Sequence, residues 1–346
     1  MARESGAGES EATGDDPAWI RPRLGRADDM RAEVWLQCDP AGVPGAGERS
    51  RTDPDPGPFT LTGTLTGPSC SLAATLPTTS PLVDQGPVEG RLPLARAICT
   101  EPGFWTPELP CLYRAEVELR RGGRLVASGR RSVGLRRCGT RGGSIRLDGR
   151  RYVPRGVAFR GGVAELSSLR SLHAAAVVGR ERPDAVLSSA ADRSGVAIVA
   201  RLVFSDGLVH DVPRAAAAIG EWALHPSTLL AVLPVGLPAE QVAAVARASL
   251  QCRGTLLLAL AVDGVAAPPP VPAGIDLIVV ELPAGRLPHE DWRNGAAVPL
   301  VACEVGATPD PERARSACDA LQARLAAWGH VPGGPPPLDW AGYLSV

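Results

Sequence analysis

Acidic side chains that follow apolar runs are the residues of this chain best placed to do chemistry. Four of them stand at or near the end of such a run: Asp206, Asp263, Glu281 and Glu304. A carboxylate beside buried apolar residues is costly unless it emerges into a polar cleft or meets a cation. Two carboxylates in one cleft can serve as nucleophile and general acid–base catalyst, whereas one alone at a strand end can simply form an ion pair.

The runs that precede these acids recur through the second half of the chain. They cover Val153–Phe159, Ala175–Val178, Gly195–Phe204, Leu229–Val235, Thr255–Val262, Ile275–Val280 and Val298–Cys303. Segments with helical spacing, such as Pro213–Leu224 and Ala239–Leu250, lie between several of them. Buried strands that alternate with helices predict a parallel sheet. Seven runs, with an eighth near Pro337–Tyr343, favour a small (β/α)8 TIM-type barrel, which would bring the acids to its carboxyl-terminal face.

The chain before about residue 150 has a different pattern. Ala32–Leu36, Phe59–Leu65 and Tyr113–Leu119 alternate apolar with polar residues, as half-buried strands do. Short strands between Pro- and Gly-rich turns predict an antiparallel β-sandwich. We therefore expect a disordered tail at 1–16, a sandwich at 17–140 and the barrel at 141–346.

Composition narrows the classes of partner. The 346 residues carry 36 basic and 37 acidic side chains, for a net charge of -1, so the broad positive field that nucleic acid requires is not expected. The first residues lack the apolar core of a signal peptide, and no run reaches membrane-spanning length. We expect a cytoplasmic protein without a membrane partner.

Cysteine and glycine patterns argue against a metal or a nucleotide cofactor. The eight cysteines form no C-x-x-C pair and have no histidine at metal-ligand spacing. No glycine-rich phosphate loop follows any expected strand. Cys303, next to Glu304, is expected to be a packing residue on its apolar strand. We expect free thiols, no metal and no cofactor.

Three strings resemble one known family. They are the segment Trp105–Tyr113 (WTPELPCLY), Val133–Arg136 (VGLR) and Leu147–Val157 (LDGRRYVPRGV). They are similar in order and spacing to the passage from sandwich to barrel in glycoside hydrolase family 2, the family of β-galactosidases, β-glucuronidases and β-mannosidases. The resemblance covers roughly residues 30–310 and implies an immunoglobulin-like β-sandwich followed by the TIM-type barrel.

Three further strings resemble segments of the family's barrel. Ala191–Val196 (ADRSGV) is similar to its D-x-x-G-I, His225–Ser227 (HPS) to its H-P-S, and Pro299–Gly306 (PLVACEVG) to its P-x-x-x-x-E-Y-G. The last string implies that Glu304 occupies the position of the catalytic nucleophile. Retaining hydrolysis also needs an acid–base carboxylate roughly 5 to 5.5 Å away. Counting along the family's pattern from His225 places that residue on Gly236.

The sequence also differs from the family's pattern at other residues near the implied site. The chain has no N-E pair, since its only Asn, Asn294, precedes Gly295. Val305 stands where the family has Tyr, and Arg180 is displaced from the family's V-R pair, which leaves it as a sugar-binding candidate. Trp340 is the best candidate for a ring that stacks on sugar, with core packing as the alternative.

Three hypotheses follow. The first is a degenerate family-2-like protein, a pseudoenzyme that keeps the scaffold and binds carbohydrate. The second is an active retaining β-glycosidase whose acid–base role has moved to Asp206, Asp263 or Glu281. The third is a structural or protein-interaction module without a sugar site. The sequence does not indicate the oligomeric state.

Overall fold

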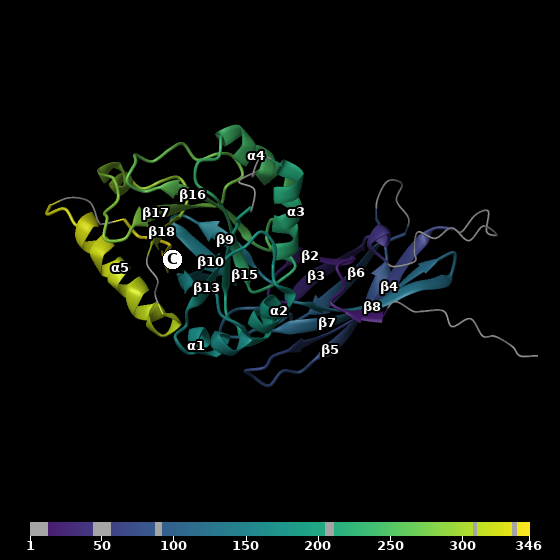
Figure 1. The fold of residues 1–346 in the computed structure, drawn as a ribbon. Coiled ribbons are helices and arrows are strands. Elements are labelled where there is room, and N and C mark those ends of the chain that lie inside the picture. Colours follow the sequence, from purple (N-terminus) through teal and green to yellow (C-terminus); the bar gives the residue numbers. More distant parts are fainter. Residues whose placement is uncertain (1–12, 44–56, 87–91, 205–210, 307–309, 334–337) are drawn as a thin grey trace, which may run out of the picture. The chain divides into compact units, whose positions relative to one another are not determined.

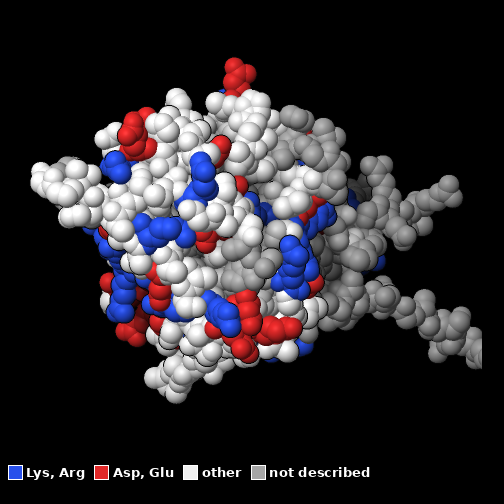
Figure 2. Space-filling model, turned by 60° about the vertical axis from the view of Figure 1, so that its left-hand side comes forward, with Lys and Arg blue, Asp and Glu red and all other residues white. Residues whose placement is uncertain are grey.

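The computed structural model describes residues 13–43, 57–86, 92–204, 211–306, 310–333 and 338–346. These residues form two compact units (Figure 1). The first unit holds most of the chain up to Val133, and the second holds Gly134–Val346 together with Cys70–Ala74 and Phe104–Cys111. On the face drawn in Figure 2, Arg and acidic side chains lie interspersed.

The first unit is a curled antiparallel sheet, as the alternating pattern predicts. Its strands are β1 (Thr13–Asp15), β2 (Ile20–Ala27), β3 (Arg31–Cys38), β4 (Phe59–Ser69), β5 (Thr78–Asp84), β6 (Leu94–Thr100), β7 (Leu112–Arg121) and β8 (Arg124–Val133). They run in the order β1-β8-β7-β4-β5-β6-β3-β2, with β1 parallel to β8. Val34, Leu36, Leu61 and Leu65 are buried at alternate strand positions, because successive side chains point to opposite faces.

The second unit contains a closed barrel of parallel strands, which confirms the predicted barrel. Its strands are β12 (Arg155–Ala158), β13 (Ala175–Gly179), β14 (Ile198–Arg201), β15 (Thr228–Leu233), β16 (Leu257–Asp263), β17 (Leu277–Pro283), β18 (Leu300–Val305) and β19 (Gly342–Ser345). Each pairs with the next, and β19 closes the ring on β12. A small sheet of β9 (Cys138–Arg141), β10 (Ser144–Leu147) and β11 (Arg150–Tyr152) precedes it.

The barrel is small because some of its crossovers lack an α-helix. The described helices are α1 (Leu166–Ser171), α2 (Ala185–Ser194), α3 (Val212–Ala223), α4 (Ala239–Ala248) and α5 (Ala314–Gly329), with 3-10 turns at Pro40–Gly42, Val163–Glu165, Leu250–Cys252, Glu290–Asn294 and Pro311–Arg313. The connection from β16 to β17 has no helix, and that from β17 to β18 has only the turn at Glu290–Asn294. Within the described residues, no helix is both long enough and apolar enough to cross a membrane.

Local signals fix the ends of α2, which holds part of a polar network. The side chain of Asp184 accepts hydrogen bonds from the backbone N–H groups of Val186 and Leu187, as an N-cap residue does. Gly195 ends the helix with φ at 73°, a left-handed conformation that glycine adopts without strain. These two residues set the position of Asp192 on the last turn of α2.

Candidate functional site

Glu304 faces the helix-covered outside of the barrel. Leu300 and Ala302 on the same strand belong to the core cluster shared with the helices, and Glu304 lies at the next alternate position. Its Oε1 accepts a hydrogen bond of 2.6 Å from Nη2 of Arg324 on α5 and one of 2.9 Å from the backbone N–H of Gly285. The Glu304 side chain is 14% exposed. Its carboxylate is therefore engaged by a cation and a backbone donor.

Different side chains point into the barrel. Nη2 of Arg201 on β14 forms an ion pair with Oε1 of Glu281 on β17. Since β14 and β17 are not neighbours in the barrel, this pair crosses its interior. Cys303 lies beside Glu281 in the strand register and is fully buried. We call the carboxyl ends of the strands, marked by Arg201, Asp263, Glu281 and Cys303, the barrel mouth.

Two carboxylates meet at the barrel mouth. Asp263 lies opposite Glu281 in the register of β16 and β17, strands that are about 4.8 Å apart. Burial raises the pKa of Glu281, the positive charge of Arg201 lowers it, and the negative charge of Asp263 raises it further. The net shift is upward, so Glu281 is a weaker acid than an ordinary glutamate. Asp263 is exposed, and its Oδ1 accepts a hydrogen bond of 3.0 Å from the N–H of Val265.

Of the four acids expected together, the structure brings Asp263 and Glu281 together. Glu304 lies on the opposite face of β18 from Cys303, and Asp206 falls outside the described residues. Arg201 was not among the residues predicted from the sequence. Its position inside the apolar run Gly195–Phe204 was a signal that could have indicated it. A charge within a buried run needs a partner, and Glu281 is that partner.

The remaining candidates have different surroundings. Gly236 follows β15 in a turn with φ at 87°, and a Cβ there would meet nothing within 4 Å. Nη1 of Arg180 pairs with Oδ2 of Asp184 at 3.2 Å, and its backbone N–H bonds to the carbonyl of Arg201. Trp340 is only 2% exposed and packs in the hydrophobic core. Trp340 is thus a core-packing residue, and its ring is not open to a sugar.

Cys303 is protonated at neutral pH. Burial raises the pKa of the Cys303 thiol to about 12, although the positive charge of Arg201 acts to lower it. A thiol in this state is not a nucleophile. No group of three or more His, Cys, Asp or Glu side chains that could hold a metal is found in the described part of the chain.

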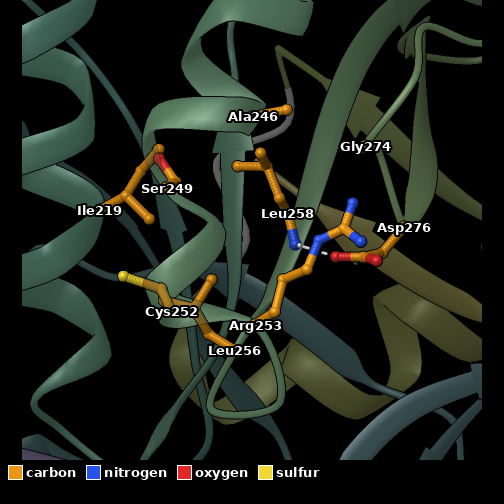
Figure 3. A pocket seen from close by; sticks show the side chains of 9 residues that line it. All are labelled: Ile219, Ala246, Ser249, Cys252, Arg253, Leu256, Leu258, Gly274 and Asp276. Carbon is orange, nitrogen blue, oxygen red and sulfur yellow. Dashed lines mark hydrogen bonds between the residues drawn. The ribbon is translucent and has the colours of Figure 1, made fainter.

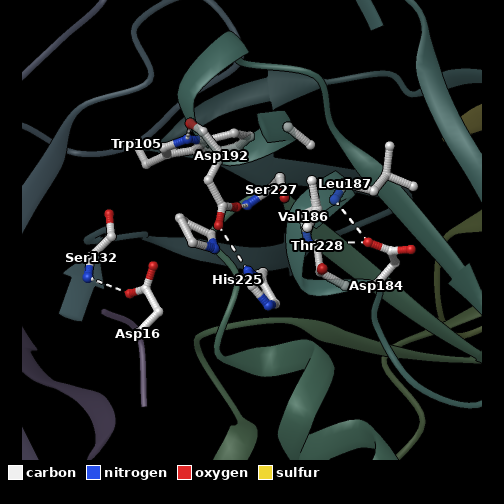
Figure 4. A network of polar contacts seen from close by, with 12 residues as sticks. Asp16, Trp105, Ser132, Asp184, Val186, Leu187, Asp192, His225, Ser227 and Thr228 are labelled. Atoms are coloured by element: carbon white, nitrogen blue, oxygen red, sulfur yellow. Dashed lines mark hydrogen bonds and ion pairs between the residues drawn. The ribbon is translucent and has the colours of Figure 1, made fainter. Parts of the chain in front are cut away.

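A second polar cluster lies at the opposite, amino-terminal ends of the strands (Figure 4). Oδ1 of Asp192 accepts a hydrogen bond of 2.8 Å from the N–H of Ser227, and its Oδ2 lies 2.9 Å from Nδ1 of His225. The carbonyl of Asp192 accepts a bond of 2.8 Å from Nε1 of Trp105. Asp192 precedes β14 and Ser227 precedes β15, so this network joins segments that lead into neighbouring strands.

Arg136 completes the same region. Its Nη1 donates to the carbonyl of Pro226 at 2.6 Å and to that of Thr228, and its side chain is buried. Burial lowers the pKa of Arg136 to about 10, although interactions with Cys138 and Asp192 act to raise it. At neutral pH the guanidinium stays charged and holds the turn before β15. Residues at this face of such a barrel serve stability.

A cavity also lies near the amino-terminal ends of the strands (Figure 3). It is lined by Ile219, Ala246, Ser249, Cys252, Arg253, Leu256, Leu258, Gly274 and Asp276. Oδ2 of Asp276 accepts a hydrogen bond of 2.9 Å from the N–H of Leu258. The cavity volume is about 10 Å³, room for about one water molecule. It cannot hold a sugar ring.

Comparisons with known proteins find similarity in structure alone. No protein-family model matches the chain, and neither does any curated protein. A β-glucuronidase of Bacteroides uniformis superposes with a TM-score of 0.60 at 16% identity, over 84% of this chain and 40% of that one. A putative β-galactosidase of Bacteroides fragilis gives 0.61 at 15%, over 95% and 54%.

A family 2 β-galacturonidase of Eisenbergiella tayi, bound to galacturonate, gives a TM-score of 0.58 at 14% identity, over 95% of this chain and 64% of that one. The chain thus spans 40 to 64% of the length of these three enzymes. At these identities the comparison establishes the fold. This chain shares the architecture of family 2 glycosidases.

Proposed function

We propose that this protein is a carbohydrate-binding member of the family 2 type that hydrolyses glycosides inefficiently or not at all. One observation carries the proposal: Arg324 and Gly285 engage the carboxylate of Glu304. In addition, Gly236, where the resemblance places the acid–base residue, has no ionisable group. Loss of a general acid alone lowers the rate by roughly 10²- to 10⁴-fold.

The barrel mouth is the proposed sugar site. Arg201, Asp263 and Glu281 provide a guanidinium and two carboxylates there, which can donate to and accept from sugar hydroxyls. The fold supports this location, because ligands of such barrels bind at the carboxyl-terminal face. The similar structures are carbohydrate-active enzymes, one of them bound to galacturonate.

Thermal unfolding with a panel of neutral sugars and uronic acids tests the proposal. A sugar at 100 times its Kd adds about 2.7 kcal/mol to the free energy of unfolding. We expect Glu281→Gln to weaken this stabilisation, and Glu240→Gln, at an exposed position of α4, to leave it unchanged. Equal stabilisation of both variants would place the sugar elsewhere.

The carboxylate pair at the barrel mouth favours a second candidate function. Asp263 and Glu281 lie in register, and the raised pKa of Glu281 suits a general acid. If this pair supplied both the nucleophile and the acid–base residue of a glycosidase, Glu281→Gln would abolish hydrolysis of nitrophenyl β-glycosides and Glu304→Gln would not. This pattern would replace the binding proposal.

Apolar side chains around the barrel mouth favour a third candidate, a protein-interaction module. Five connections that follow barrel strands each carry an exposed aliphatic residue: Val163, Val203, Val235, Val265 and Leu287. The carboxyl ends of parallel strands meet at one face, so these residues share it. The absence of a thermal shift with every sugar of the panel would favour this function.

A further inference from the structure

Cys70 and Cys111 lie opposite each other in two neighbouring segments of the chain. Cys70 directly follows β4 and Cys111 directly precedes β7. These antiparallel strands place Ser69 opposite Leu112, and Oγ of Ser69 donates to the carbonyl of Leu112 at 3.2 Å. The register shifts between Thr66 and Ser69, and its continuation by one residue past Ser69 and Leu112 would set Cys70 opposite Cys111. The thiol of Cys70 is near enough to Cys111 to contribute to the raised pKa of the Cys111 thiol, after the larger effect of burial.

The register suits a covalent bridge. Residues opposed in antiparallel strands have Cα atoms about 4.5 to 5.5 Å apart, within the range of about 4.4 to 6.8 Å found in disulfides. At such a separation of the Cα atoms, rotation of the two side chains can bring the sulfur atoms together. Both cysteines are free in this structure.

The Cys70–Cys111 pair differs from the buried cysteines of the barrel because one of its thiols is partly exposed. Cys70 is partly exposed, whereas Cys111 is buried. Cys318 also contributes to the raised pKa of Cys303, but both are fully buried, and the Cys318 thiol donates to the carbonyls of Gly156 and Tyr343. An external reagent therefore reaches Cys70 first.

We propose that Cys70 and Cys111 are a site of reversible oxidation, converted to a disulfide by a low-molecular-weight disulfide. The Cys70 thiolate attacks the reagent, forming a mixed disulfide and releasing one thiol. Cys111 loses its proton, attacks the Cys70 sulfur and releases the second thiol. Two protein thiols are thereby oxidised and one reagent disulfide is reduced to two thiols. Burial raises the pKa of Cys111 to about 11, which assigns the first attack to Cys70.

The bridge would join two segments, Cys70–Ala74 and Phe104–Cys111, that belong to the second unit together with the barrel. Next to Cys70, Oγ of Ser71 donates to the carbonyl of Arg193 at 2.6 Å. In the segment before Cys111, Nε1 of Trp105 donates to the carbonyl of Asp192. The disulfide would close a loop of about 40 residues, which restricts the unfolded chain and stabilises the folded one.

Oxidation of the full chain with oxidised glutathione tests the proposal. The expected product has lost two hydrogen atoms by intact mass, yields a Cys70–Cys111 cross-linked peptide, and unfolds several degrees above the protein reduced with dithiothreitol. Cys70→Ser should abolish all three changes, while Cys138→Ser, at another partly exposed cysteine, should retain them.

Three outcomes would overturn the proposal. They are a stable glutathione adduct on Cys70 that Cys111 does not resolve, a cross-link between other cysteines, and an oxidised form with an unchanged or lower Tm. The Cys70→Ser protein reduced with dithiothreitol should unfold with the reduced wild type, which separates loss of the bridge from damage to the fold.

Discussion

The Glu304 carboxylate lies 2.6 Å from the guanidinium of Arg324, which is on the helix that follows the strand of Glu304. This ion pair joins β18 to α5 on the outside of the barrel. The carboxylate inside the barrel at the same level is that of Glu281, paired with Arg201. A strand that presents Cys303 inward must present Glu304 outward, so the polar groups of the barrel mouth come from other strands.

Removing Arg324 should destabilise the protein. Arg324→Gln leaves the 14% exposed Glu304 side chain without its cation, and we expect the free energy of unfolding to fall by about 1 to 3 kcal/mol. On the same helix, Arg315 pairs with Asp319 at the surface. Arg315→Gln should therefore lower the free energy of unfolding by only about 0.3 to 0.5 kcal/mol. Urea unfolding compares the two variants, and equal effects would show that the Glu304–Arg324 pair is not structurally important.

The two aspartates at the ends of α2 should differ in their contribution to stability. Asp192→Ala leaves the buried N–H of Ser227 without an acceptor and removes the partner of His225, so we expect a loss of about 2 to 4 kcal/mol. Asp184→Ala removes an exposed N-cap, a loss of about 1 kcal/mol. Thermal and urea unfolding should rank the variants in this order. The reverse order would contradict the structural role of the network in Figure 4.

The raised pKa of Glu281 makes stability depend on pH. Below its ordinary pKa of 4.5, the carboxyl group is protonated in both states. As the pH rises toward the higher folded-state pKa, the folded protein keeps a proton that the unfolded chain releases, so the free energy of unfolding falls. Glu281→Gln removes this contribution. The stability of this variant relative to wild type should therefore increase as the pH rises above about 4.5, and a constant or decreasing difference would show that the pKa is not raised.

Introducing a carboxylate at residue 236 should not create a glycosidase. The space around Gly236 is open, but its φ of 87° makes a side chain there cost about 1 to 2 kcal/mol. Gly236→Glu should fold, with slightly lower stability, and should not accelerate hydrolysis of nitrophenyl β-glycosides, since Arg324 still engages Glu304. A rate increase that Glu304→Gln removes would contradict this expectation.

The architecture was predictable because it depends on patterns that repeat along the chain. Alternation at Phe59–Leu65 and Tyr113–Leu119 matches β4 and β7, and the apolar runs match β12 to β18. The eighth strand lies slightly later than expected, at Gly342–Ser345. The immunoglobulin-like topology of the sheet remains a prediction.

The site was harder to predict because the direction of a side chain at a strand end depends on register. Nothing in the string Val301–Val305 indicates that Cys303 points inward and Glu304 outward. The partnership of Arg201 with Glu281 joins residues from strands three positions apart, which a single sequence does not reveal. The strings that carry the family resemblance proved to include scaffold residues, since Trp105, Asp192 and His225 belong to one network at the amino-terminal face.

Pre-steady-state hydrolysis of nitrophenyl β-glycosides, including the galactoside and the glucuronide, tests the central claim most directly. It compares wild type with Glu304→Gln, and the Bacteroides uniformis β-glucuronidase serves as the active control. If Glu304 is a structural ion-pair residue, wild type and variant will release nitrophenol at the same background rate, without a burst. A stoichiometric burst in the wild type that Glu304→Gln abolishes would identify Glu304 as a working nucleophile and contradict the account.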